Sequence, residues 1–156
     1  MHTYKDDVRI INPEENYNVQ EVFHTQPVTE EKSKFSGHAS TLTVDTPINS
    51  VLATLAADPD ISTADHTIYA YRYGDVEGCC DDGEHGAGLR LLKVLQSKQV
   101  KDTFVAVTRW FGGQHLGPRR FELIETCAQN AVDLLSTEDP EDSTDDEASQ
   151  DNETSL

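Results

Sequence analysis

The sequence predicts an α+β domain, a two-layer sandwich in which a four-stranded mixed sheet carries its helices on one face. Two observations predict this class. Three stretches show apolar residues at helical spacing, and four others are rich in β-branched and aromatic residues. Their order along the chain is ββαβαβα, and 156 residues are enough for one domain with its own hydrophobic core.

The first two strands are expected at Val19–Val28 and Lys34–Val44, where β-branched, aromatic and threonine residues are frequent. The charged and polar residues 30–33 between them predict the turn of an antiparallel pair. The side chains expected to face the core are Phe35, Ala39 and Leu42.

A helix is expected after Thr46 and Pro47, which fit an N-cap followed by a first-turn proline. Apolar residues then recur at helical spacing, at Ile48, Val51, Leu52, Leu55 and Ala56. The next strand, Thr67–Tyr73, presents alternate residues to opposite faces. We expect the face that carries its tyrosines to be the buried one.

Two further helices are expected, and one more strand lies between them in the sequence. The first begins near residues 86–88 and has an apolar face made of Leu89, Leu92, Val94 and Leu95. The strand at Phe104–Val107 is a continuous apolar run, typical of a central strand that is covered on both faces. The last helix follows Pro118, and its apolar face consists of Phe121, Ile124, Ala128, Ala131 and Leu135.

The net charge of −17 is concentrated near the C-terminus. Residues 137–156 contain nine acidic residues, no lysine or arginine and almost no apolar residue, so we expect a disordered acidic tail. We expect residues 1–18 to be a flexible leader and residues 19–136 to be the folded domain. The acidic balance argues against DNA as a partner. No signal peptide or apolar stretch of ~20 residues is present, which favours a cytoplasmic protein without a membrane partner.

Three carboxylates lie within four residues, at Asp81, Asp82 and Glu84. They could supply oxygen ligands to a hard cation or form an acid/base pair. The simpler interpretation is that they cap the helix that follows, because carboxylates complement the positive end of a helix dipole. We favour capping, since one short cluster does not fill a six-oxygen shell. Close packing of that helix likewise explains the small residues 86–88 better than an anion site does.

Histidines and cysteines form no recognisable catalytic pattern. His66, His85 and His115 are expected near strand ends or in loops, and none has the short ligand spacing that identifies a zinc site. A serine nucleophile elbow is also missing. We therefore predict no catalytic residue and no cofactor.

Arginines and aromatic residues gather around the end of the strand that follows the second helix. Arg119 and Arg120 occupy the first turn of the last helix, where the dipole disfavours cations, so they are expected to serve another purpose. One interpretation is a basic and aromatic patch for a protein or for RNA phosphates. The other is that Arg119 or Arg120 pairs with an acidic-turn carboxylate and joins the two turns. The predicted partner-binding residues are Asp81, Asp82, Glu84, Arg90, Arg109, Trp110, Phe111, Arg119 and Arg120.

Several separated motifs resemble those of the Impact family of translation regulators, in the same order. They cover about residues 20–135 and begin with Lys32-Ser33-Lys34-Phe35. The others are Ile68-Tyr69-Ala70-Tyr71-Arg72, Asp81-Asp82-Gly83-Glu84, Ala87-Gly88, Arg90-Leu91-Leu92, Val107-Thr108-Arg109-Trp110-Phe111-Gly112-Gly113 and Leu116-Gly117-Pro118-Arg119-Arg120-Phe121. The last two motifs resemble the eukaryotic branch of the family.

The resemblance implies a fold like domain 2 of ribosomal protein S5 and domain IV of elongation factor G. It implies a non-enzymatic regulator that inhibits the initiation-factor-2-alpha kinase of the amino-acid starvation response by competing for that kinase's ribosome-associated activator. Ribosomes and monomeric actin are further partners that it implies. Full-length relatives also carry an N-terminal RWD domain, which the eighteen leader residues are too few to encode. The alternatives are a metal-dependent hydrolase that uses Asp81, Asp82 and Glu84, or a ribosome- or RNA-binding module.

Overall fold

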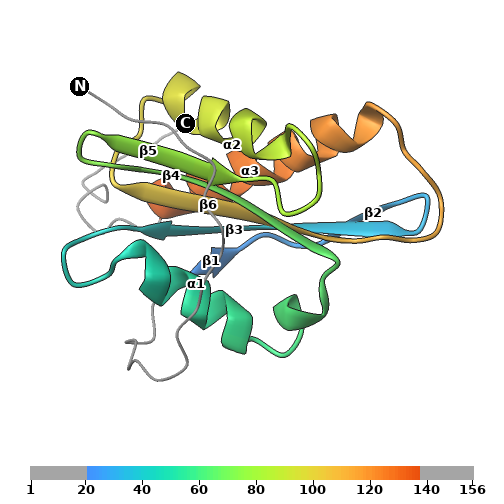
Figure 1. The fold of residues 1–156 in the computed structure, drawn as a ribbon, viewed down its shortest axis with the longest axis horizontal. Coiled ribbons are helices and arrows are strands. Elements are labelled where there is room, and N and C mark those ends of the chain that lie inside the picture. Colours follow the sequence, from blue (N-terminus) through green and yellow to red (C-terminus); the bar gives the residue numbers. More distant parts are fainter. Residues whose placement is uncertain (1–20, 138–156) are drawn as a thin grey trace, which may run out of the picture.

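The computed structural model describes residues 21–137, which form one antiparallel sheet with helices on both of its faces (Figure 1). The strands are β1 (Phe23–His24), β2 (Val28–Glu30), β3 (Ser33–Thr41), β4 (His66–Tyr73), β5 (Val76–Cys80) and β6 (Thr103–Trp110). The helices are α1 (Ile48–Ala57), α2 (Ala87–Ser97) and α3 (Arg119–Thr137), with a 3-10 turn at Ile61–Thr63. The predicted leader and the tail beyond Thr137 lie outside the described residues.

The strand order is β1-β3-β6-β4-β5, and β2 also pairs with β3. β2 and β3 are joined by Glu31 and Lys32, whose φ angles of 49° and 68° are those of a two-residue hairpin turn. The strand expected over Val19–Val28 is therefore two short strands, which both pair with β3. β6 lies between β3 and β4 in the centre of the sheet. It is buried along nearly its whole length, as the apolar run Phe104–Val107 predicted.

The predicted α+β class is confirmed, whereas the four-stranded mixed sheet is wrong in its details. β5 was missed, although Gly74-Asp75 between two strand-like segments is a hairpin signal, and Gly74 has a φ of 58°. Without β5, the path from β4 through α2 to β6 is a parallel crossover. The additional strand reverses the chain once more, so that β6 runs antiparallel to β4.

The prediction that all helices share one face is also wrong. α2 and α3 cover one face, and α1 covers the other (Figure 1). The physical reason is that both faces of the central strands are apolar. Tyr69 and Phe104 stack 5.5 Å apart beneath α1, while Ile68 and Val105 face α2 and α3. The tyrosine face of β4 is thus buried except at Tyr73, and the opposite face is buried at Ile68 and Ala70.

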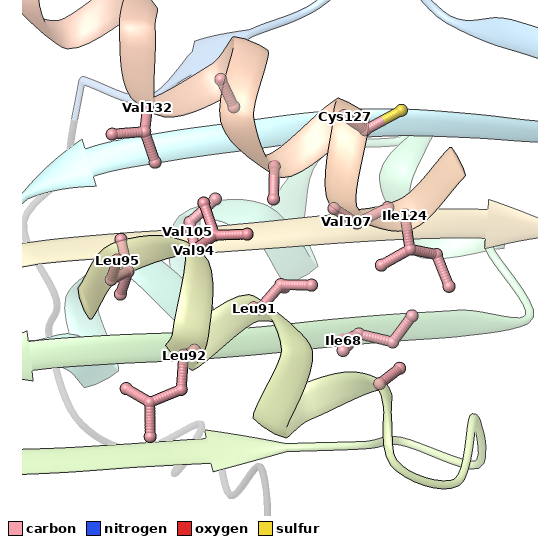
Figure 2. Close-up of a cluster of buried hydrophobic side chains, with 14 of the residues drawn as sticks. Ile68, Leu91, Leu92, Val94, Leu95, Val105, Val107, Ile124, Cys127 and Val132 are labelled. Carbon is pink, nitrogen blue, oxygen red and sulfur yellow. The ribbon is translucent and has the colours of Figure 1, made fainter. Parts of the chain in front are cut away.

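The larger core lies between the sheet and the pair α2 and α3. Figure 2 shows Leu91 and Leu95 of α2 and Ile124 of α3 gathered over β4 and β6, in one cluster with Ile68, Val105 and Val107. α3 approaches β3 closely at Gly37, where an added Cβ would lie 2.3 Å from the carbonyl oxygen of Cys127. Phe35, Ala39 and Leu42 are buried as expected, although Leu42 belongs to the α1 side.

α1 begins after Pro47, without the predicted side-chain cap from Thr46. The hydroxyl oxygen of Thr46 instead accepts a hydrogen bond from the backbone N–H of Thr43 at 2.7 Å. Among residues 21–137, no helix combines the length and the apolar character needed to cross a bilayer.

Candidate functional site

Glu84 occupies the centre of a buried ionic cluster that joins three segments of the chain. It lies in the loop between β5 and α2 and is 5% exposed. One carboxylate oxygen accepts a hydrogen bond from Nη1 of Arg109 at the end of β6, and the other accepts from Nε of Arg120 in α3 at 3.1 Å. We call Glu84, Arg109 and Arg120 the Glu84 cluster. It is the predicted connection between the two turns, and Arg120 rather than Arg119 makes it.

Asp82 and His66 hold the acidic turn against the first residues of β4. The carboxylate of Asp82 accepts a hydrogen bond from the backbone N–H of Thr67 at 2.6 Å. Nδ1 of His66 lies 2.8 Å from the carbonyl oxygen of Asp82, so this ring nitrogen carries the proton and donates it. Nε2 of His66 lies 3.7 Å from the nearer Glu84 oxygen. His66 is therefore fixed at the edge of the Glu84 cluster.

Asp81 caps α2 as predicted, whereas the same prediction is wrong for Asp82 and Glu84, which bind Thr67 and the two arginines instead. Its two carboxylate oxygens accept hydrogen bonds from the backbone N–H groups of Gly86 and Gly88, at 2.9 and 2.7 Å. A Cβ at Gly88 would lie 2.8 Å from Asp81 and 2.9 Å from the backbone of Cys80. The small residues at this helix start thus allow close packing, and Asp81 already occupies two of the amides that an anion would need.

The predicted basic and aromatic patch is divided between the two faces of the sheet. Consecutive residues of a strand point to opposite faces, so Arg109 lies on the side of α2 and α3 while Trp110 lies on the side of α1. Trp110 donates a hydrogen bond from Nε1 to Thr63, and Lys34 lies 4.2 Å above its ring. Arg109 is only 4% exposed, so it offers almost no surface to a protein partner.

Arg119 is directed away from the Glu84 cluster, toward the hairpin of β2 and β3. Its Nε and Nη2 donate to the two carboxylate oxygens of Glu30 at 2.8 and 3.0 Å, and its Nη1 donates to Glu122 at 2.7 Å. Its side chain is 49% exposed. Of the two arginines that the sequence offered as partners of the acidic turn, Arg120 is therefore the one that pairs with it, while Arg119 pairs with Glu30 and Glu122.

Aromatic rings and guanidinium groups alternate along the surface on the α2 and α3 side. Phe111, which is 44% exposed, follows β6. Phe121 of α3 lies beneath two guanidinium groups, 4.3 Å from that of Arg120 and 4.4 Å from that of Arg90. Arg90 also pairs with Glu125 at 2.7 Å. We call Phe111, Arg120, Phe121 and Arg90 the cleft face.

An open cleft of about 620 Å³ lies above the Glu84 cluster. It is lined by Asp65, His66, Glu84, Arg109, Phe111, His115, Leu116, Gly117 and Arg120. Sequence reasoning missed Asp65 as a wall residue and assigned His66 and His115 no role. The available signal was their position, because His66 begins a strand and His115 lies in the loop that leads to α3.

The three acidic-turn carboxylates do not converge on a common point. Asp81 binds helix amides, Asp82 binds the amide of Thr67, and Glu84 binds two arginines. Within the described part of the chain, no group of three histidine, cysteine or acidic side chains is arranged to hold a metal ion. The geometry therefore gives the metal-dependent hydrolase no support.

Comparison with known proteins shows which family this chain resembles. A family model described as the Impact N-terminal domain matches residues 31–132. The chain is 40% identical over 127 residues to "Protein IMPACT" of Bos taurus and 39% identical over 127 residues to "Protein IMPACT" of Homo sapiens. Each match covers 77% of this chain and 40% of the relative, so the chain spans about two fifths of the length of these relatives.

A solved structure described as a hypothetical protein shares the fold, with a TM-score of 0.59 and 24% sequence identity. The likeness covers 74% of this chain and 62% of that one. The Asp81–Glu84 turn, the end of β6 and the start of α3, which together build the Glu84 cluster, all fall within the matched residues 31–132. The chain therefore belongs to the Impact family.

Proposed function

We propose that this protein regulates translation without catalysis, by binding the ribosome-associated activator of the initiation-factor-2-alpha kinase and keeping it from the kinase. Membership of the Impact family supports the general role. The amino-acid starvation response, inhibition of the kinase, and ribosomes and monomeric actin as further partners belong to the same proposal.

The observation that carries the proposal is the cleft face, which has the composition of a protein-binding surface. Aromatic and arginine side chains contribute most at protein interfaces, especially where the structure holds them in place before binding. Here Phe111 and Leu89 are exposed apolar side chains, 44% and 39% accessible, and Arg90 lies in the groove between α2 and α3. The Glu84 cluster connects the loop before α2 to the end of β6 and to the start of α3, the segments that carry or border these side chains.

The surface chemistry indicates an acidic partner segment with apolar side chains. Arg90 and Lys93 border the α2–α3 groove of about 530 Å³, together with Leu89 and Phe121. Their charges attract carboxylates, and the exposed rings and aliphatic groups provide apolar contact area. Asp81, Asp82, Glu84 and Arg109, predicted earlier as partner contacts, are expected to act indirectly by holding this surface in shape.

The test compares variants on opposite sides of the sheet. Tagged full-length chains carrying Arg90→Glu or Lys34→Glu are used to capture the activator from extract of amino-acid-starved cells, with quantification by mass spectrometry. We expect Arg90→Glu to lose the activator and Lys34→Glu, beside Trp110 on the α1 side, to retain it. Equal recovery with both variants, or no recovery with the unmodified chain, would refute the proposal.

The functional readout is phosphorylation of initiation factor 2 alpha in starved cells. Expression of the unmodified chain is expected to lower this phosphorylation, and the Arg90→Glu chain is expected to leave it unchanged. If both chains lower it equally, the cleft face is not the regulatory surface.

A further inference from the structure

We propose that the cleft above the Glu84 cluster binds a small organic anion, whose phosphate or carboxylate group pairs with Arg109 and Arg120 and whose body lies against Phe111. This inference goes beyond the proposed function, because a soluble anion needs no protein partner to occupy the cleft. It rests on the charge, the hydrogen bonding and the walls of the site.

The charge balance of the Glu84 cluster is positive. Two guanidinium groups share one carboxylate, and both Arg109 and Glu84 are almost completely buried, with side-chain exposures of 5% each. Buried charges in proteins are normally matched by partners of opposite sign. Asp65, the other carboxylate at the cleft, accepts a hydrogen bond from the backbone N–H of Phe111 at 2.7 Å. Among residues 21–137 Asp65 forms no ion pair with either arginine, so Glu84 is the one carboxylate in this part of the chain that pairs with Arg109 and Arg120.

The hydrogen bonding of Arg109 is incomplete in a way that fits an oxyanion. Nη1 donates to Glu84, but the buried Nε–H has no acceptor among the described residues. Buried donors are seldom left without a partner. Arg119 shows what that edge of a guanidinium group can bind, because its Nε and Nη2 donate hydrogen bonds to the two carboxylate oxygens of Glu30. A carboxylate or phosphate presents the same pair of acceptors.

Arg120 provides a second group of donors at the cleft. Its Nε donates to Glu84 and its Nη1 donates to the carbonyl oxygen of Gly117 at 2.7 Å. Nη2 has no acceptor within the part of the chain that the structure describes. With a side chain that is 29% exposed, Arg120 is accessible from the cleft, whereas Arg109 lines the cleft with a side chain that is 5% exposed.

The cleft is lined partly by apolar and aromatic side chains, which suit the organic part of a ligand better than an inorganic ion. Phe111 and Leu116 are apolar, and the rings of Phe111 and His115 lie 5.4 Å apart. The volume of about 620 Å³ lies in the range of ligand sites, roughly 300–1,000 Å³. An aromatic phosphate or carboxylate can therefore place its charged group at the arginines and its ring against Phe111.

The experiment follows the Nε–H resonance of Arg109 in ¹⁵N-labelled full-length protein during titration. The probes are phenyl phosphate, benzoate, inorganic phosphate and, as the uncharged control, phenol. We expect saturable shifts with phenyl phosphate or benzoate, weaker binding of inorganic phosphate and no response to phenol. The comparison of phenyl phosphate with benzoate identifies which oxyanion the cleft prefers.

Adjacent arginines provide a matched pair of variants. Arg120→Gln removes charge-assisted donors from the cleft and is expected to weaken binding roughly 10- to 100-fold, while Arg119→Gln leaves it unchanged. The exposed Phe111→Ala should lower phenyl phosphate affinity to that of inorganic phosphate, without affecting inorganic phosphate. Absence of saturable binding by every anion, or equal weakening by Arg119→Gln and Arg120→Gln, would overturn the proposal. Neither outcome bears on binding of the kinase activator.

Discussion

Glu84→Gln removes the one negative charge that two arginines share, with almost no change in side-chain volume. The substituted amide can accept a hydrogen bond from one guanidinium group but cannot neutralise either. Arg109, with 5% side-chain exposure, cannot turn to the solvent to recover its hydration. The variant therefore leaves a buried cation without its counter-ion, and we expect the folded state to be strongly destabilised.

The size of the effect follows from burial. Removing one partner of a buried ion pair costs about 3–5 kcal/mol. Unfolding entropy is about 2.1 cal/mol/K per residue, so each kcal/mol shifts the melting temperature of a domain of this size by roughly 4 °C. The expected decrease is therefore about 12–20 °C. Glu122→Gln is the matched control, because Glu122 has 67% side-chain exposure and pairs with the exposed Arg119, an interaction of about 0–1 kcal/mol.

Urea unfolding of the two variants, followed by circular dichroism, measures both free energies. We expect Glu84→Gln to lower the free energy of unfolding by at least about 2 kcal/mol more than Glu122→Gln does, at an unchanged m-value. If both lie within about 1 kcal/mol of the unmodified protein, the Glu84 cluster does not hold the three segments together.

Three further predictions concern other parts of the structure. Gly112→Ala should cost about 1–3 kcal/mol in urea unfolding, because the new Cβ would lie 2.1 Å from the backbone of Lys32. Burial lowers the pKa of His38 from 6.5 to about 3, and nearby His24 contributes. The unfolded chain binds the proton more readily, so this contribution to stability is complete above pH 6.5 and is lost as pH falls toward 3, by about 2 kcal/mol at pH 5. Burial raises the pKa of Cys127 to about 11, so iodoacetamide should alkylate the partly exposed Cys80 well before Cys127, as measured by peptide mass spectrometry.

Each of these predictions has a clear contrary result. A Gly112→Ala chain as stable as the unmodified protein would show that the loop after β6 can move away from the hairpin. A His38→Gln chain with the same decrease in stability between pH 7 and pH 5 would show that other groups cause it. Alkylation of Cys127 as fast as that of Cys80 would show that α3 separates readily from the sheet.

The sequence predicted the helices and the central strand well, because their signals are local. Most of the apolar positions predicted in the last two helices are buried, although Leu89 is 39% exposed and Leu91, which the prediction left out, is buried instead. The uninterrupted run Phe104–Val107 also identifies buried positions without knowledge of the topology. That run already implied a sheet covered on both faces, in conflict with the prediction of helices on one face. β5 was missed because its residues, Val76–Cys80, form a short segment with a glycine and two cysteines rather than a clear apolar alternation.

The candidate site was predicted in its parts but not in its connections. A rule about carboxylates just before a helix predicted capping by the acidic turn, but which of its three carboxylates reaches the helix amides depends on the path of the loop. Which of two adjacent arginines reaches Glu84 depends on the direction in which α3 leaves its first turn, and this is set by tertiary packing. The separation of Arg109 from Trp110 follows from strand alternation, a local rule that was available and was not applied.

The most direct test of the central claim is the affinity of the full chain for the purified ribosome-associated activator of the kinase, measured by biolayer interferometry. We expect saturable binding by the unmodified protein and by Lys34→Glu, and loss of binding in a chain that carries both Phe111→Ala and Arg90→Glu. Binding of the double variant with unchanged affinity, or no binding by the folded, unmodified protein, would contradict it.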